Sequence, residues 1–146
     1  MGFLTRLLLG NGTLRPELRA ELESEGILLL EEGLVGRISY KHFKAPGRRH
    51  HGKVTPVGIG LAASEKRLVA YCRSGRAELI DSPFGSPRLD ALDISLEGDD
   101  TVALHVDYSR IESPEVSGEI TIRAKTPNAP AIVERLQERL GPRPLS

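Results

Sequence analysis

The sequence predicts a mainly β fold, a small barrel or a pair of orthogonal sheets of about seven strands, closed by one C-terminal helix. Two observations support this prediction. Apolar and polar residues alternate along 89–97, 101–108 and 119–125, as they do in half-buried strands. The apolar spacing then changes to that of a helix over 128–140. A sheet followed by a single helix favours a binding fold over an enzyme.

Composition limits the class of protein. A chain of 146 residues is long enough to bury the core of one domain. Its 20 Lys and Arg residues balance 20 Asp and Glu residues, which argues against a nucleic-acid partner. Cys72 is the only cysteine and forms no intrachain disulfide. The sequence shows no secretion signal and no apolar run of about 20 residues, so we expect a cytoplasmic protein.

Residues 1–26 are expected to form a helical extension in front of the main domain. A first helix is predicted over 2–9, with an apolar face that would touch its own domain, a second copy, another partner or a membrane. A second helix is predicted to begin at Pro16 and to end at Gly26. Its apolar residues repeat every four positions, at Leu14, Leu18 and Leu22.

The main domain is expected over 27–141, with a short tail at 142–146. Its strands include 34–40, 57–63, 67–72 and 77–81, of which 67–72 is apolar enough to be buried on both faces. Glycines within 57–63 predict a bulge, a bend or a close backbone approach. A loop is predicted over 82–87, which holds two prolines and a glycine.

The last hairpin has the clearest alternation of inward and outward positions. The inward row is predicted to be Leu92, Ile94, Leu96, Val102, Leu104, Val106 and Tyr108, followed on the last strand by Ile120, Ile122 and Ala124. The outward row is predicted to include Ser95, Ala103, His105 and Asp107. In the closing helix, Val133, Leu136 and Leu140 are expected to cover the core.

The segment from Gly58 to Tyr71 has the sequence GIGLAASEKRLVAY. It resembles the strand–turn–strand of bacterial pleckstrin-homology-like domains, and the order of the later hairpin and helix agrees with that family. Ala63-Ser64 stands where Leu-Thr is more usual, and the chain lacks the tryptophan that many eukaryotic members carry in the capping helix. The resemblance spans about 25–140 and implies a seven-stranded barrel or orthogonal sheets capped by a C-terminal helix.

One segment, 41–53, has an unusual composition, with five Lys or Arg residues, three His and no acid. It is expected to be a loop between the first two strands of the main domain. The resemblance implies that anionic lipid headgroups bind at this connection, although the spacing does not match the family's phosphoinositide motif. The candidate anion-binding residues are Lys41, Lys44, Arg48, Arg49 and Lys53. The alternative is a solvated basic loop with no ligand.

No catalytic, cofactor or metal site is predicted. His50 and His51 are adjacent and have no Cys, Asp or Glu close by in sequence, so a metal site is not favoured. His105 and Asp107, with Ser95, lie on an outward row that offers no oxyanion hole. The glycines of 58–60 lack the third glycine of a dinucleotide site, and Cys72 is expected to be a small buried side chain.

These observations favour a non-enzymatic binding or adaptor module for an unidentified protein partner, contacted through sheet edges and loops. Recognition of an anionic lipid or phosphate through 41–53 is the first alternative. A small-ligand carrier or an enzyme without a known motif is the second.

Overall fold

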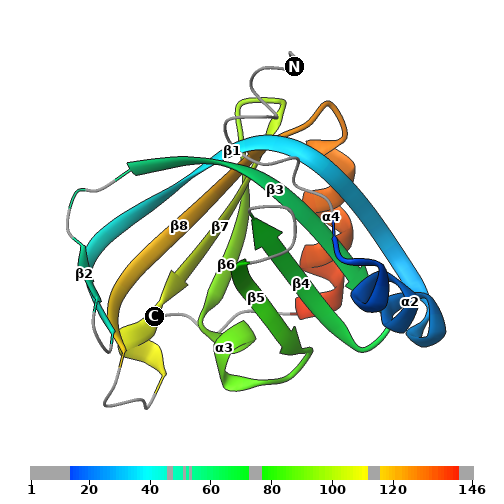
Figure 1. The fold of residues 1–146 in the computed structure, drawn as a ribbon, viewed down its shortest axis with the longest axis horizontal. Coiled ribbons are helices and arrows are strands. Elements are labelled where there is room, and N and C mark those ends of the chain that lie inside the picture. Colours follow the sequence, from blue (N-terminus) through cyan, green and yellow to red (C-terminus); the bar gives the residue numbers. More distant parts are fainter. Residues whose placement is uncertain are drawn as a thin grey trace. The chain divides into compact units, whose positions relative to one another are not determined.

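The computed structural model describes residues 14–45, 48–50, 52, 54–72, 77–111 and 116–141. The protein is mainly β, as predicted, and ends in a helix. The described residues form two compact units, one drawn from 1–36 and 56–84 and the other from 37–55 and 85–146. The long first strand, β1 (Ile27–Ala45), contributes residues to both units (Figure 1).

The first unit contains one helix and the strands at one end of the pairing order. Its elements are α2 (Pro16–Glu25), the first part of β1, β3 (Val54–Ser64), β4 (Arg67–Cys72) and β5 (Ala77–Pro83), with the strands in the order β1-β3-β4-β5. β3 with β4 and β4 with β5 are antiparallel pairs. The prediction that 67–72 is a strand buried on both faces is confirmed, since five of its six residues are buried.

The second predicted helix is confirmed as α2, with Pro16 in its first turn and Gly26 at its C-terminal end, where φ is +92°. The predicted apolar stripe packs against the sheet in one cluster. Its three leucines are Leu14, Leu18 and Leu22, and they lie against Ala62, Val69 and Tyr71. Small residues on this face of β3 leave room for the helix. The boundary predicted after residue 26 stays a prediction, and the first predicted helix lies outside the described residues.

Gly60 of β3 lies in a regular part of the β3–β4 pair. β3 and β4 pair without a shift from Ile59 to Ala63, and the register shift of this unit lies in the next pair, between Ala70 and Tyr71 of β4. Because side chains alternate along a strand, the glycines share the face of Ala62 that α2 covers. A close backbone approach at these glycines, one of the three predicted meanings, stays a prediction.

The second unit contains the strands at the other end of the pairing order. Its elements are the rest of β1, β2 (Arg48–His50), α3 (Pro87–Asp90), β6 (Leu92–Glu97), β7 (Thr101–Asp107), η1 (Tyr108–Arg110), β8 (Ser117–Lys125) and α4 (Ala129–Leu140). The strand order is β1-β8-β7-β6, and β2 pairs with β1. The predicted hairpin of β6 and β7 is confirmed, with an unbroken antiparallel register.

The closing helix is confirmed as α4, which contacts β6 and β7 and ends at Gly141, where φ is +73° (Figure 1). Val133 and Leu136 are buried as predicted, but Leu140 is only half-buried because it lies in the last turn. The side chain of Gln137 donates a 2.8 Å hydrogen bond to the carbonyl of Ile94 on β6. The helix is thus attached to the strand that ends the order of this unit.

Two predicted boundaries were wrong. Leu89 was expected to open a strand, but it lies in α3, because Pro87 in the first turn of that helix fixes a helical φ. Ser82 and Pro83 were expected in a loop, but they continue β5. β5 ends the strand order of its unit, and proline is tolerated on such an edge because no further strand needs its missing N–H.

The expected exposure of two residues was also wrong. Leu96 is 40% exposed, because it lies on the last strand in the order and close to the turn that follows. Ala103, expected to face outward, is buried. The ion pair between Arg123 on β8 and Glu97 on β6, with 2.8 Å between Nε and Oε1, spans the intervening strand β7, on which Ala103 lies directly opposite Arg123. Tyr108 is buried as predicted but lies in η1 rather than in β7.

Candidate anion-binding hairpin

The basic segment predicted as a loop is largely a hairpin of two strands. β1 continues to Ala45, and β2 pairs with it in antiparallel register, with Phe43 opposite His50 and Lys44 opposite Arg49. The expectation of a loop was wrong because Phe43 supplies an apolar anchor that holds the end of β1 in the sheet. We call 41–50 the basic hairpin.

Aromatic contacts attach the basic hairpin to its unit. Phe43 is buried, and its ring centroid lies 5.4 Å from that of Tyr40 and 6.0 Å from that of Tyr108. The backbone N–H of Gly52 donates a 2.9 Å hydrogen bond to the carbonyl of Tyr40. The hairpin is therefore held from one face, which leaves its charged side chains on the other side free to meet solvent.

The backbone at His42 changes the alternation of side chains. Its φ is +50°, in the left-handed region that residues other than glycine rarely adopt. Lys41 and His42 are both exposed in succession, and Phe43 follows as a buried residue. On β8, the neighbouring Gly118 has φ of +90°, and a Cβ built there would lie 2.3 Å from the carbonyl oxygen of His42. The two strands meet at this point without space for a side chain.

The charges of the basic hairpin are only partly balanced. The ammonium of Lys41 lies 3.8 Å from Glu119 on β8, whose other carboxylate oxygen lies 2.9 Å from Nε2 of His105. Lys44 and Arg49 are exposed and have no ion-pair partner among the residues that the structure describes. Like charges directly opposite each other on two strands are destabilising. An anion bound between them would remove this repulsion.

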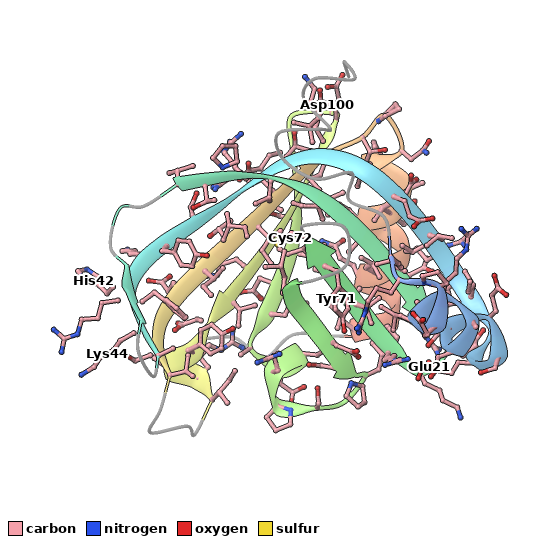
Figure 2. All side chains as sticks on the ribbon, viewed as in Figure 1. Glu21, His42, Lys44, Tyr71, Cys72 and Asp100 are labelled. Atoms are coloured by element: carbon pink, nitrogen blue, oxygen red, sulfur yellow. The ribbon has the colours of Figure 1, made fainter. Side chains whose placement is uncertain are left out.

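The five candidate residues have different outcomes. Lys41, Lys44 and Arg49 are exposed on the basic hairpin, and Figure 2 shows Lys44 projecting outward on the same side as His42. Arg48 lies in β2, but its side chain is outside the described part of the chain, as is all of Lys53. The structure thus brings Lys44 and Arg49 together, while Lys41 is engaged by Glu119.

The outward row of β7 does not form a catalytic triad. His105 is hydrogen-bonded to Glu119, and its partner across β6 is Asp93, not Ser95. Asp107 accepts hydrogen bonds from both the N–H and the hydroxyl of Ser109, at 3.0 and 2.6 Å. These bonds, with the Ser109 hydroxyl first, lower the pKa of Asp107 below its usual value. The predicted interpretation, exposed polar neighbours, holds in part, since Ser95 is exposed whereas His105 and Asp107 are half-buried.

A cluster that the sequence analysis missed lies in the first unit around Arg67. Its guanidinium forms ion pairs with Glu21 at 2.8 Å, Glu25 at 3.1 Å and Asp81 at 3.0 Å. The hydroxyl of Tyr71 donates a further 3.2 Å hydrogen bond to Asp81. We call these residues the Arg67 cluster. A signal existed, because an arginine that opens a strand buried on both faces has to find carboxylates.

The Arg67 cluster shifts the pKa values of Arg67 and Glu25. Partial burial opposes the charge of Arg67, but its hydrogen bonds to Glu21 and Asp81 outweigh that effect and raise its pKa further. The pKa of Glu25 is lowered, mainly by a hydrogen bond from the Ser64 hydroxyl and then by Arg67. The charged groups of the cluster therefore pair with one another. This is expected for side chains that hold α2 against the strands.

The comparisons with known proteins do not assign a family: the chain matches no family model and no curated protein. No helix in the described part of the chain is long and apolar enough to cross a membrane. Within the same residues, no group of three or more His, Cys, Asp or Glu side chains is placed to hold a metal ion. Cys72 is buried, as predicted, and His51 lies outside the described residues.

Proposed function

We propose that the chain is a non-enzymatic binding module of the pleckstrin-homology-like class. Three features support this class. The strands after β1 run as two meanders, β3-β4-β5 and β6-β7-β8, and the last strand returns to β1. β1 contributes residues to both units and lies between the two meanders in the strand order. One helix, α4, follows the last strand. A cytoplasmic site of action fits this proposal, because the single cysteine is buried and free.

The ligand we propose is a phosphate group, bound by the basic hairpin. The observation that carries this proposal is the placement of Lys44 directly opposite Arg49, both exposed and without a described acidic partner. A guanidinium presents paired N–H donors to phosphate oxygens, and an ammonium adds a point charge beside them. Each basic residue near an anionic surface contributes about 1 kcal/mol, so two or three of them give weak binding that depends on salt.

A protein partner at the sheet edges receives less support. The edge strand β6 has its Ile94 carbonyl occupied by Gln137, and the edge strand β5 ends in Pro83, which cannot donate to an added strand. Capped edges of this kind resist pairing with another chain. The basic hairpin is thus the better-supported recognition surface, and a protein partner becomes an outcome of the test.

The proposal is tested with vesicles and with inorganic phosphate. Pelleting with phosphatidylcholine vesicles containing one-quarter phosphatidylserine is compared at about 50 mM and about 500 mM salt, where the screening length differs about threefold. Inorganic phosphate is titrated in parallel, with amide shifts of the hairpin as the signal. We expect binding at low salt that Lys44→Glu/Arg49→Glu abolishes and that the control Lys125→Glu/Arg135→Glu retains.

The two arms separate the two sources of the phosphate. Vesicle binding together with weak phosphate shifts indicates a lipid surface, whereas hairpin shifts without pelleting indicate a soluble phosphate compound. If neither probe binds at low salt, the anion proposal is wrong and the protein-partner alternative takes its place. Equal loss of binding in the control variant would also contradict a site on the basic hairpin.

A further inference from the structure

The charges of the chain are separated into two neighbouring blocks of opposite sign. Residues 37–55 contain six Lys or Arg and no acid, whereas residues 14–36 contain six Glu and two Arg. The whole chain has a formal net charge of zero. Two copies therefore meet without net repulsion, while each copy offers one basic and one acidic surface.

The acidic block forms the exposed side of α2. Glu17, Glu21 and Glu23 are all exposed on this helix, and Figure 2 labels Glu21 on α2. Of the two arginines in this block, Arg19 is already engaged, because it lies 3.7 Å from Glu23 and 3.2 Å from Glu32. Arg67 in turn is shared by three carboxylates. The surface of α2 thus keeps an excess of negative charge after its own ion pairs are formed.

We propose that the protein self-associates head to tail, with the basic hairpin of one copy docked on the acidic side of α2 of a second copy. The two surfaces carry complementary charge. Lys44 and Arg49 lack described acidic partners, and α2 carries more carboxylates than its own cations neutralise. A second copy is the occupant, because this chain supplies both complementary surfaces at equal concentration. The contact is heterologous, since each copy uses a different surface. It does not depend on the proposed phosphate ligand.

The test exchanges charges between the two surfaces in the full chain. One variant, Lys44→Glu/Arg49→Glu, makes the hairpin acidic, and the other, Glu17→Lys/Glu23→Lys, makes α2 basic. All four side chains are exposed, so both variants are expected to keep the fold, which amide spectra check. The mass of the particles is measured by sedimentation and by light scattering after gel filtration, at about 50 mM and about 500 mM salt.

We expect the unchanged protein to associate at low salt and to dissociate at high salt. Each charge-exchanged variant alone should associate at least about tenfold more weakly, because its two surfaces now carry the same sign. An equimolar mixture of the two variants should associate again, since both cross-contacts are complementary. The variant Lys125→Glu/Arg135→Glu changes the net charge of the chain as much as the hairpin variant does, and it should associate normally.

Three results would overturn the proposal. They are a monomeric unchanged protein at low salt, association that the hairpin variant leaves intact, and a mixture of the two variants that stays monomeric. The outcome is separate from that of the phosphate experiment, because the variant Glu17→Lys/Glu23→Lys is expected to lose self-association while it keeps the basic hairpin for an anion. The two experiments together therefore distinguish a protein that self-associates but binds no phosphate from one that binds phosphate but does not self-associate.

Discussion

The hydroxyl of Ser64, which is fully buried, donates a 2.7 Å hydrogen bond to the carboxylate of Glu25, 39 residues earlier in the chain. The same oxygen accepts hydrogen bonds from the backbone N–H groups of Lys66 and Arg67, at 3.1 and 3.2 Å. One side chain thus fixes the tight turn between β3 and β4 and joins that turn to the end of α2. The backbone N–H of Glu65, which donates to the carbonyl of Gly26 at 2.9 Å, adds a second link.

Replacing Ser64 with alanine removes all three hydrogen bonds and leaves two backbone donors and a carboxylate with fewer partners. We expect Ser64→Ala to lower the free energy of unfolding by about 1–3 kcal/mol. Urea unfolding followed by circular dichroism measures this loss. The exposed Ser95 provides the control, and Ser95→Ala should change stability by less than about 0.5 kcal/mol. A Ser64→Ala protein as stable as the unchanged one would contradict this role.

The stability of the protein should fall in acid because of Glu25. Its pKa in the folded state is lowered from 4.5, so its contribution is present above that ordinary value and is lost as the pH falls through the lower folded value. Ser64 is the largest cause of the lowering. The destabilisation by Ser64→Ala should therefore be greater at pH 7 than at a pH below the lowered folded pKa, where the carboxyl is protonated in both states. Urea midpoints at the two pH values measure the difference, and an equal difference at both would rule this linkage out.

The periodicity of the sequence predicted the elements whose burial is one-sided. β6, β7 and α4 have one apolar face each, and the alternation or helical spacing of their residues identified them. α2 was found from its leucine stripe, its proline and its terminal glycine. In these segments the local pattern and the tertiary contacts favour the same structure, and no long-range information is needed.

The basic hairpin and the Arg67 cluster could not be predicted in the same way. The composition of 41–53 indicated a charged surface, but the pairing of Lys44 with Arg49 depends on how Phe43 contacts Tyr108, which lies 65 positions later in the chain. The carboxylates around Arg67 come from a helix and from a different strand. Such contacts are set by strand order, which the alternation of one sequence does not reveal. The charged residues are therefore visible in the sequence, whereas their partners are not.

Gln137 protects the edge strand β6, and its removal should have a measurable effect. The bond from its Nε2 to the Ile94 carbonyl attaches α4 to that edge. We expect Gln137→Ala to cost about 0.5–1.5 kcal/mol of unfolding free energy, because water replaces the lost donor only in part. Amide hydrogen exchange in β6 should become faster as well. The neighbouring, exposed Glu138 serves as control, and a similar effect of Glu138→Ala would mean that a general loss of helix stability is responsible.

Gly118 should tolerate no side chain. Its φ of +90° is unfavourable for an L residue, and a Cβ there would overlap the backbone of His42, with 2.3 Å to the carbonyl oxygen. Because backbone atoms cannot turn aside as a side chain can, the end of β1 must move away from β8. We expect Gly118→Ala to cost about 2–4 kcal/mol, as unfavourable φ and overpacking add together. The matched control is Gly98→Ala, where φ is +64° and the nearest atom, in Asp100, is 4.0 Å away, so that only about 1–2 kcal/mol of backbone strain is expected. Thermal unfolding of both variants measures the difference, and equal losses would show that the close approach of β1 and β8 at His42 contributes nothing beyond the strained φ.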